Sequence, residues 1–147
     1  MTRAKRMQPV VRAVGHDERE SAARLAIAER HVLDAERRHT ELGAYQADYA
    51  GGLERRIAEG ITANELRDFR TFLARLADAI RAQGRVLSQA KAECEAAREA
   101  WRGAARRARA IGHVVDRWQA EERRERDRRE QRETDERALE RARSRTR

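Results

Sequence analysis

The fold of this chain is decided by residues 66–118, which read LRDFRTFLARLADAIRAQGRVLSQAKAECEAAREAWRGAARRARAIGHVVDRW. In steps of alternately three and four residues, the segment passes through sixteen positions, of which only Gln83 is polar. We name these positions the second seam: Leu66, Phe69, Leu73, Leu76, Ile80, Gln83, Leu87, Ala90, Cys94, Ala97, Trp101, Ala104, Ala108, Ile111, Val115 and Trp118. A 3.5-residue apolar repeat of this length is typical of a long helix that buries a narrow stripe against another helix. Because such a structure has no pocket, the repeat predicts a protein that binds, spaces or couples.

A weaker repeat, the first seam, lies earlier in the chain. Nine of its thirteen positions are apolar, and Glu18 and His39 interrupt it. The positions are Val11, Val14, Glu18, Ser21, Leu25, Ala28, Val32, Ala35, His39, Leu42, Gln46, Tyr49 and Leu53. The first seam therefore predicts a second helix face of about six heptads.

Glycines and a capping signal separate the two seams. Gly60 suits a turn or the C-terminal cap of a helix, and Thr62 followed by Glu65 is the pattern of a capping box. A short connection between two helices with apolar stripes favours an antiparallel hairpin. We therefore predict an all-α, two-helix antiparallel coiled coil that forms a single domain over residues 1–147. Its first helix is expected at about 5–56, its turn at about 57–62 and its longer second helix at about 63–142.

The composition changes after Trp118. Of residues 119–147, twenty of twenty-nine are charged. If Leu53 faces Leu66, Trp118 lies near the start of the chain, and we expect a charged overhang from residue 119. Acid-first pairs four residues apart, such as Glu122–Arg126 and Glu133–Arg137, stabilise a helix that is polar all round.

The predicted core follows from the seams. Its members are Leu25, Val32, Leu42, Tyr49, Leu66, Phe69, Leu73, Ile80, Leu87, Trp101 and Ile111. The sequence allows two interpretations for each of two bulky side chains. Phe72 lies beside the second seam, where it either widens the core by meeting Tyr45 and Tyr49 or forms an exposed patch for a protein partner. Trp118 lies where the partner helix runs out, and it is either the end of the seam or an anchor for a binding partner.

Composition excludes several classes of protein. Charged residues make up 41% and aromatic residues 4% of the chain, which also describes disordered proteins, but a disordered chain has no reason to keep its apolar residues in register. The net charge of +8 comes from basic residues that are interleaved with acidic ones, which weakens a nucleic-acid interpretation. The single cysteine fits a reducing compartment. No stretch has the roughly 20 apolar residues that span a bilayer, so we expect a cytoplasmic protein without membrane insertion.

No motif points to catalysis. None of the four histidines lies four residues from another, so no helical metal pair exists, and His39 and Cys94 occupy seam positions where packing explains them. The chain also lacks a glycine-rich phosphate loop and a nucleophile–base pattern. We therefore expect a protein that is not an enzyme and that has no metal or cofactor.

Several short motifs, taken together in order, resemble the flagellar FliJ family, whose members are small coiled-coil components of the flagellar type III export apparatus. The resemblance covers nearly the whole chain, with matching length and turn position. It is carried by Ala22-Ala23-Arg24-Leu25, Tyr45-Gln46 with Tyr49, Phe69-x-x-Phe72-x-x-x-Leu76-x-x-Ala79-Ile80, Trp101-Arg102, and Gln131-Arg132 with Asp135-Glu136.

The resemblance implies a function in flagellum assembly, and through it in motility and chemotaxis. Members of the family bind the export ATPase ring, couple it to the membrane export gate protein, and interact with export chaperones. They act in the cytoplasm, peripherally at the cytoplasmic face of the inner cell membrane. The family's gate contact corresponds to Phe72, Leu76, Ala79 and Gln83, although histidine is also seen in the family at the position of Gln83. The contact with the ATPase ring would use the chain termini, with Trp118, Arg123 and Arg126 as candidates.

Two other hypotheses remain open on the residues alone. The excess of arginine fits a basic coiled coil that binds nucleic acid or the ribosome, although the interleaved acidic residues oppose this interpretation. An unrelated dimeric coiled-coil scaffold would also carry two seams.

Overall fold

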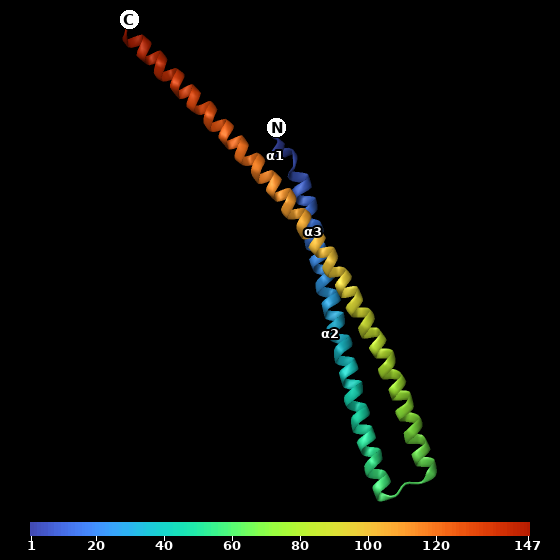
Figure 1. Cartoon of the computed structure of the whole chain (residues 1–147). Helices are drawn as coiled ribbons and strands as arrows, with labels where there is room; N and C mark the ends of the chain where they lie inside the picture. The colour runs from blue at the N-terminus through green and yellow to red at the C-terminus, as the bar shows by residue number, and fades with distance from the viewer. The chain divides into compact units, whose positions relative to one another are not determined.

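The computed structural model describes residues 1–147 and contains helices without strands. In chain order these are α1 (Arg3–Arg6), α2 (Gln8–Glu59) and α3 (Ala63–Arg145). Figure 1 shows α2 and α3 running in opposite directions on the two sides of a short turn. The predicted all-α helical hairpin is confirmed.

Local chemistry explains where the helices begin and end. Pro9 lies in the first turn of α2, where the missing N–H is not needed. At the other end of α2, Gly60 adopts a φ of 102° and donates its N–H to the carbonyl of Ile57 at 3.2 Å. The Thr62 hydroxyl then accepts the N–H of Glu65 at 3.2 Å, which satisfies one of the free donors at the start of α3. The chain therefore reverses direction within three residues, between Glu59 and Ala63.

The contacts divide the chain into two compact units. We name them the turn unit, Glu20–Trp101, and the terminal unit, which combines Met1–Arg19 with Arg102–Arg147. Within each unit, α2 and α3 bury the two seams against each other, and every seam position is buried or half-buried. No large side chain is completely buried. The buried side chains are small or medium in size: Ala4, Ala35, Leu76, Ala90, Cys94, Ala104, Ala105 and Val115. The core is therefore thin, as expected for a pair of helices.

An aromatic cluster fills the core of the turn unit next to the turn. The centre of the Tyr49 ring on α2 lies 4.3 Å from the centre of the Phe72 ring and 5.7 Å from that of the Phe69 ring, both on α3. Tyr45 approaches Phe72 edge-on at 6.2 Å and Tyr49 at 5.7 Å. Tilted and edge-on rings add about 0.5–1.5 kcal/mol per pair beyond the area that they bury. Phe72 therefore widens the core here, as one of its two interpretations predicts.

The start of the chain packs on α3 within the terminal unit. The Thr2 hydroxyl caps α1, and Ala4 is only 3% exposed. The Arg3 guanidinium forms an ion pair with Glu121 at 2.9 Å, and the Ala4 N–H donates to the Glu122 carboxylate at 3.3 Å. Every residue from 123 to 147 is exposed, so the last part of α3 has no partner helix in the chain.

Candidate functional site

The four residues matched to the gate contact lie along α3 in the turn unit, but they differ in exposure. Leu76 is only 7% exposed, so it belongs to the packed seam. Phe72 and Gln83 are half-buried and Ala79 is exposed. The Gln83 amide donates to the carbonyl of Ala35 on α2 at 3.5 Å, which ties this polar seam position to the facing helix. Of these four residues, Phe72 and Ala79 therefore offer the most accessible apolar surface, and they lie two helical turns apart on the same side of α3.

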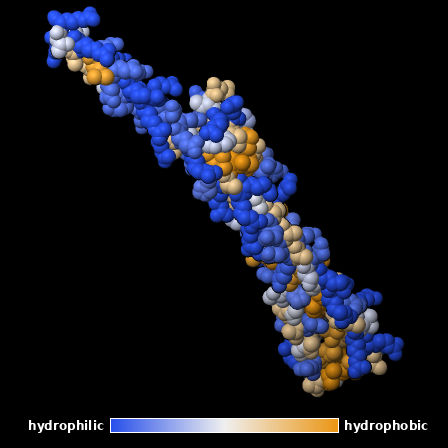
Figure 2. Space-filling view, turned by 45° about the horizontal axis from the view of Figure 1, so that its top comes forward, coloured by the Kyte–Doolittle hydropathy of each residue, from blue (hydrophilic) through white to orange (hydrophobic).

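Residues of α2 extend this surface across the seam. Tyr45 is 51% exposed although it contacts Phe72, and a groove that contains Leu42 and Gln83 lies next to it. Figure 2 shows apolar surface gathered around the turn of the molecule. Tyr45 stands among the residues that carry the family resemblance, but not among those matched to the gate contact, which all lie on α3. The expected contact between Tyr45 and Phe72 is formed, and the structure adds that the Tyr45 ring remains exposed.

The predicted core residues have one property in common. All eleven, from Leu25 to Ile111, are half-buried, and none is completely enclosed. Two helices cannot fully surround a large side chain, so each of these eleven residues keeps part of its surface in solvent.

The three candidates for the ATPase contact lie in the terminal unit. Trp118 is half-buried, and the Arg3 guanidinium carbon lies 5.0 Å from the centre of its ring, within the range of a cation–π contact. The register of the seams correctly places Trp118 near the start of the chain. Arg123 and Arg126 are exposed and line a polar groove together with Thr2, Ala4, Lys5 and Gln8 from the start of the chain.

The charge ladder after Trp118 forms only in part. Glu133 pairs with Arg137 at 3.8 Å, as predicted, and Glu125 reaches Arg132 at 3.8 Å. The Glu122 carboxylate accepts the Ala4 N–H instead of pairing with Arg126, so that predicted pair is not formed. Sequence spacing missed this contact because the partner of Glu122 is a backbone group more than a hundred residues away.

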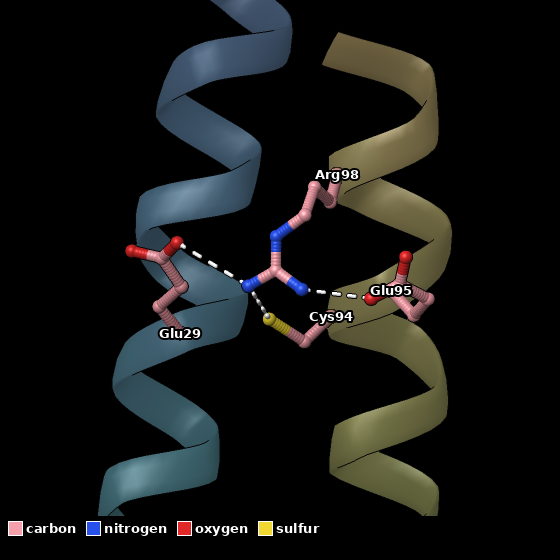
Figure 3. Close-up of polar contacts among 4 residues, drawn as sticks. All are labelled: Glu29, Cys94, Glu95 and Arg98. Carbon is pink, nitrogen blue, oxygen red and sulfur yellow. Dashed lines mark hydrogen bonds and ion pairs between the residues drawn. The ribbon is translucent and has the colours of Figure 1, made fainter. Parts of the chain in front are cut away.

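A second polar cluster joins the two helices of the turn unit. Arg98 on α3 pairs with Glu95 at 2.7 Å and reaches Glu29 on α2 at 3.8 Å, and its Nη2 lies 3.9 Å from the Cys94 sulfur (Figure 3). Cys94 is 6% exposed and packs in the seam. These contacts align α2 with α3 and leave the thiol covered.

The net charge is concentrated in one of the two units. The terminal unit has 21 Lys and Arg residues against 12 Asp and Glu, whereas the turn unit has 13 against 14. Figure 2 shows hydrophilic surface over the C-terminal part of α3, and a second apolar patch between that segment and the turn. The apolar surface near the turn and the basic surface near the termini are therefore chemically different.

No three His, Cys, Asp or Glu side chains are grouped so that they could hold a metal ion. None of the helices combines the length and the apolar character that crossing a membrane requires.

Comparison with known families identifies the chain. Residues 3–147 match the family model described as the flagellar FliJ protein, which covers essentially the whole chain. Comparisons with curated proteins and with solved structures find no match. The match confirms the resemblance carried by the ordered motifs. The chain belongs to the flagellar FliJ family, and it is therefore a component of flagellar protein export.

Proposed function

We propose that this chain couples the flagellar export ATPase to the membrane export gate and assists export chaperones during flagellum assembly. The mechanism is associative: the terminal unit docks on the ATPase ring, and the apolar surface near the turn contacts the gate protein. The protein would act in the cytoplasm, held at the inner face of the membrane by its partners. Family membership supports this proposal, and the presence of two chemically different surfaces in one chain supports the division of roles.

The proposed gate surface consists of Phe72 and Ala79 on α3 with Tyr45 on α2. The observation that carries this assignment is the 51% exposure of Tyr45 together with its edge-on contact with the half-buried Phe72, because the two rings leave adjoining apolar surface in solvent. Exposed apolar patches on a small protein commonly mark sites of protein interaction. Leu76 would support the patch from below, since it is packed in the seam.

The gate assignment is tested with a substitution that changes the surface and spares the core. Ala79→Glu adds a charge at an exposed helix position, and Ala74→Glu is the matched control because Ala74 is also exposed on α3 but lies away from Phe72 and Ala79 around the helix. We expect Ala79→Glu to weaken binding to the purified gate protein by about tenfold or more and to reduce swimming, because burying an unpaired carboxylate in an apolar interface is costly. Ala74→Glu should behave as wild type.

Phe72→Ala provides a second variant, and its helix content and stability must be measured alongside because Phe72 also packs in the aromatic cluster. Leu76→Ala is less suitable, because removing a side chain that is 7% exposed costs about 2–5 kcal/mol of stability and confounds the result. Circular dichroism should show unchanged helix content for Ala79→Glu. If Ala79→Glu and Phe72→Ala both bind the gate protein as wild type does, the assignment of this surface is wrong.

A further inference from the structure

The terminal unit contains a groove that neither seam explains. It runs between the start of the chain and α3, and both segments contribute side chains. Its lining residues are Thr2, Ala4, Lys5, Gln8, Gln119, Glu122, Arg123 and Arg126. We name it the terminal groove.

Several contacts hold the two walls of the groove together. The Arg3–Glu121 ion pair at 2.9 Å and the bond from the Ala4 N–H to Glu122 at 3.3 Å fix α1 on α3. Arg3 also covers the ring of Trp118, and Ala4 is nearly buried beneath these contacts. The terminal groove is thus formed before any partner arrives, which lowers the entropy cost of binding.

The charges that line the groove are strongly unbalanced. Lys5, Arg123 and Arg126 each contribute a cation, and none of the three takes part in an ion pair within the chain. The single acidic residue in the lining, Glu122, already accepts a hydrogen bond from the Ala4 backbone. The side chains of Thr2, Gln8 and Gln119 add neutral hydrogen-bonding groups. Unpaired guanidinium groups beside neutral donors are the arrangement that recognises carboxylates.

We propose that the terminal groove binds a carboxylate-rich segment of a partner protein. The identification of that partner as the export ATPase rests on the proposed function, whereas the acidic chemistry of the segment follows from the groove itself. The segment would place its carboxylates between Lys5 on one wall and Arg123 and Arg126 on the other.

The distribution of acidic residues favours an acidic peptide over a longer polyanion. Glu121, Glu125 and Asp127 lie on the same stretch of α3 as the two arginines. A duplex or an anionic bilayer would meet these carboxylates together with the groove, and their repulsion would reduce its affinity. A short peptide segment contacts the groove alone.

The test uses a fluorescein-labelled hexaglutamate peptide, with hexaglutamine as the neutral control. Fluorescence polarisation at low salt, roughly 50 mM, keeps the attraction unscreened. The full chain is compared with Arg123→Ala/Arg126→Ala and with the matched control Arg124→Ala/Arg128→Ala, which removes the same charge from the same stretch of α3 outside the groove. All four positions are exposed and alanine favours helix, so both variants should fold.

We expect the groove variant to bind hexaglutamate about tenfold more weakly than wild type and the control variant to lose less than threefold. Lys5→Ala should also weaken binding, because Lys5 lies on the opposite wall. If both double variants lose affinity equally, or if neither does, attraction by the overall charge explains binding and the proposal fails. It also fails if a twelve-nucleotide single strand binds more tightly than hexaglutamate and this preference disappears in the groove variant.

A parallel pull-down with the purified export ATPase separates this proposal from the proposed function. Loss of ATPase binding in the groove variant but not in the control supports both. If the wild-type chain fails to bind the ATPase while hexaglutamate still discriminates between the variants, the proposed function fails and the acidic site stands. If the groove variant loses hexaglutamate but keeps full affinity for the ATPase, the ATPase is not the occupant of the groove.

Discussion

Gly60 is the only residue of the chain with a positive φ, and it lies where the chain leaves α2. At φ 102° a Cβ atom strains the backbone, although nothing lies within 4 Å of the place it would occupy. The conformation of the turn therefore depends on the backbone freedom of glycine and not on the space around it.

Gly60→Ala should lower the free energy of unfolding by about 1–2 kcal/mol, because alanine must adopt a strained conformation or shift the turn. Gly51→Ala is the control: Gly51 is helical, its Cβ would also meet nothing within 4 Å, and alanine stabilises a helix interior by about 0.5–1 kcal/mol relative to glycine. Urea titrations followed by circular dichroism measure both changes. Equal stabilities for the two variants would mean that the turn tolerates a side chain.

Arg98 acts between helices, whereas most ion pairs of the turn unit lie within one helix. Its guanidinium group contacts Glu95 on its own helix and Glu29 on the facing helix (Figure 3). Arg81 pairs only with Asp78 on α3 and is a natural comparison.

Arg98→Ala should cost about 0.5–1 kcal/mol of stability, and Arg81→Ala should cost less, because an exposed pair within one helix contributes little. A double-mutant cycle of Arg98→Ala with Glu29→Ala measures the part that crosses between the helices. A coupling energy of zero in this cycle would show that the 3.8 Å contact contributes nothing.

Much of the helical structure could be predicted from the spacing of residues in the sequence. Both seams are predictable because burial between two helices demands an apolar residue at nearly every turn, and all the seam positions are indeed covered. The start of α3 is predictable from Thr62, whose hydroxyl caps it. The end of α3 is harder to predict. The helix continues to Arg145, a few residues beyond the expected end at about 142, because the charged segment lacks a proline or glycine that would stop it.

The association of α1 with α3 follows no periodic pattern. It depends on one ion pair, one backbone N–H and one guanidinium above a ring, and spacing encodes none of these. For the same reason the sequence marks Arg123 and Arg126 as candidates but does not reveal that Lys5 shares a groove with them. Likewise, the motifs match Phe72 and Ala79 to the gate contact, whereas the exposure of Tyr45 depends on how its ring packs.

Residues 127–147 should be dispensable for the stability of the rest of the chain. They are exposed throughout, so deleting them removes no buried apolar surface, and the thermal midpoint should move by less than roughly 3 °C. Deletion of residues 1–6 is the comparison, since it removes the buried Ala4 and the Arg3–Glu121 pair and should lower the midpoint further. Thermal unfolding followed at 222 nm measures both. A larger loss from the C-terminal deletion would show that the exposed segment supports the hairpin.

At the scale of the whole molecule, the hairpin predicts that the first and second seams pack against each other within one chain. Arg56 and Glu65 lie on either side of the turn and form an ion pair at 2.8 Å. A single chain therefore brings its two helices together without help from a second copy, in contrast to an extended dimeric scaffold.

Cross-linking tests this prediction directly. In a Cys94→Ala background, cysteines that replace Arg56 and Glu65 should be joined by a short bismaleimide within one chain, so that the product keeps the mass of about 17.0 kDa. Mass spectrometry and denaturing gels distinguish this product from a linked pair of chains. A product of twice the mass, at low protein concentration, would indicate an extended dimer.

The thin core also determines how the structure opens. No large side chain is completely buried. In a pair of helices, each layer of side chains packs on the facing helix and on the layers next to it. Opening one layer exposes little surface, so the ends of the helices should fray layer by layer before the rest of the chain unfolds. Amide protection against exchange with deuterated water should then form a gradient, lowest after residue 122 and highest around the buried Ala35, Ala90 and Cys94. In a protein built in this way, the two helices can separate locally while the packing elsewhere along them is kept.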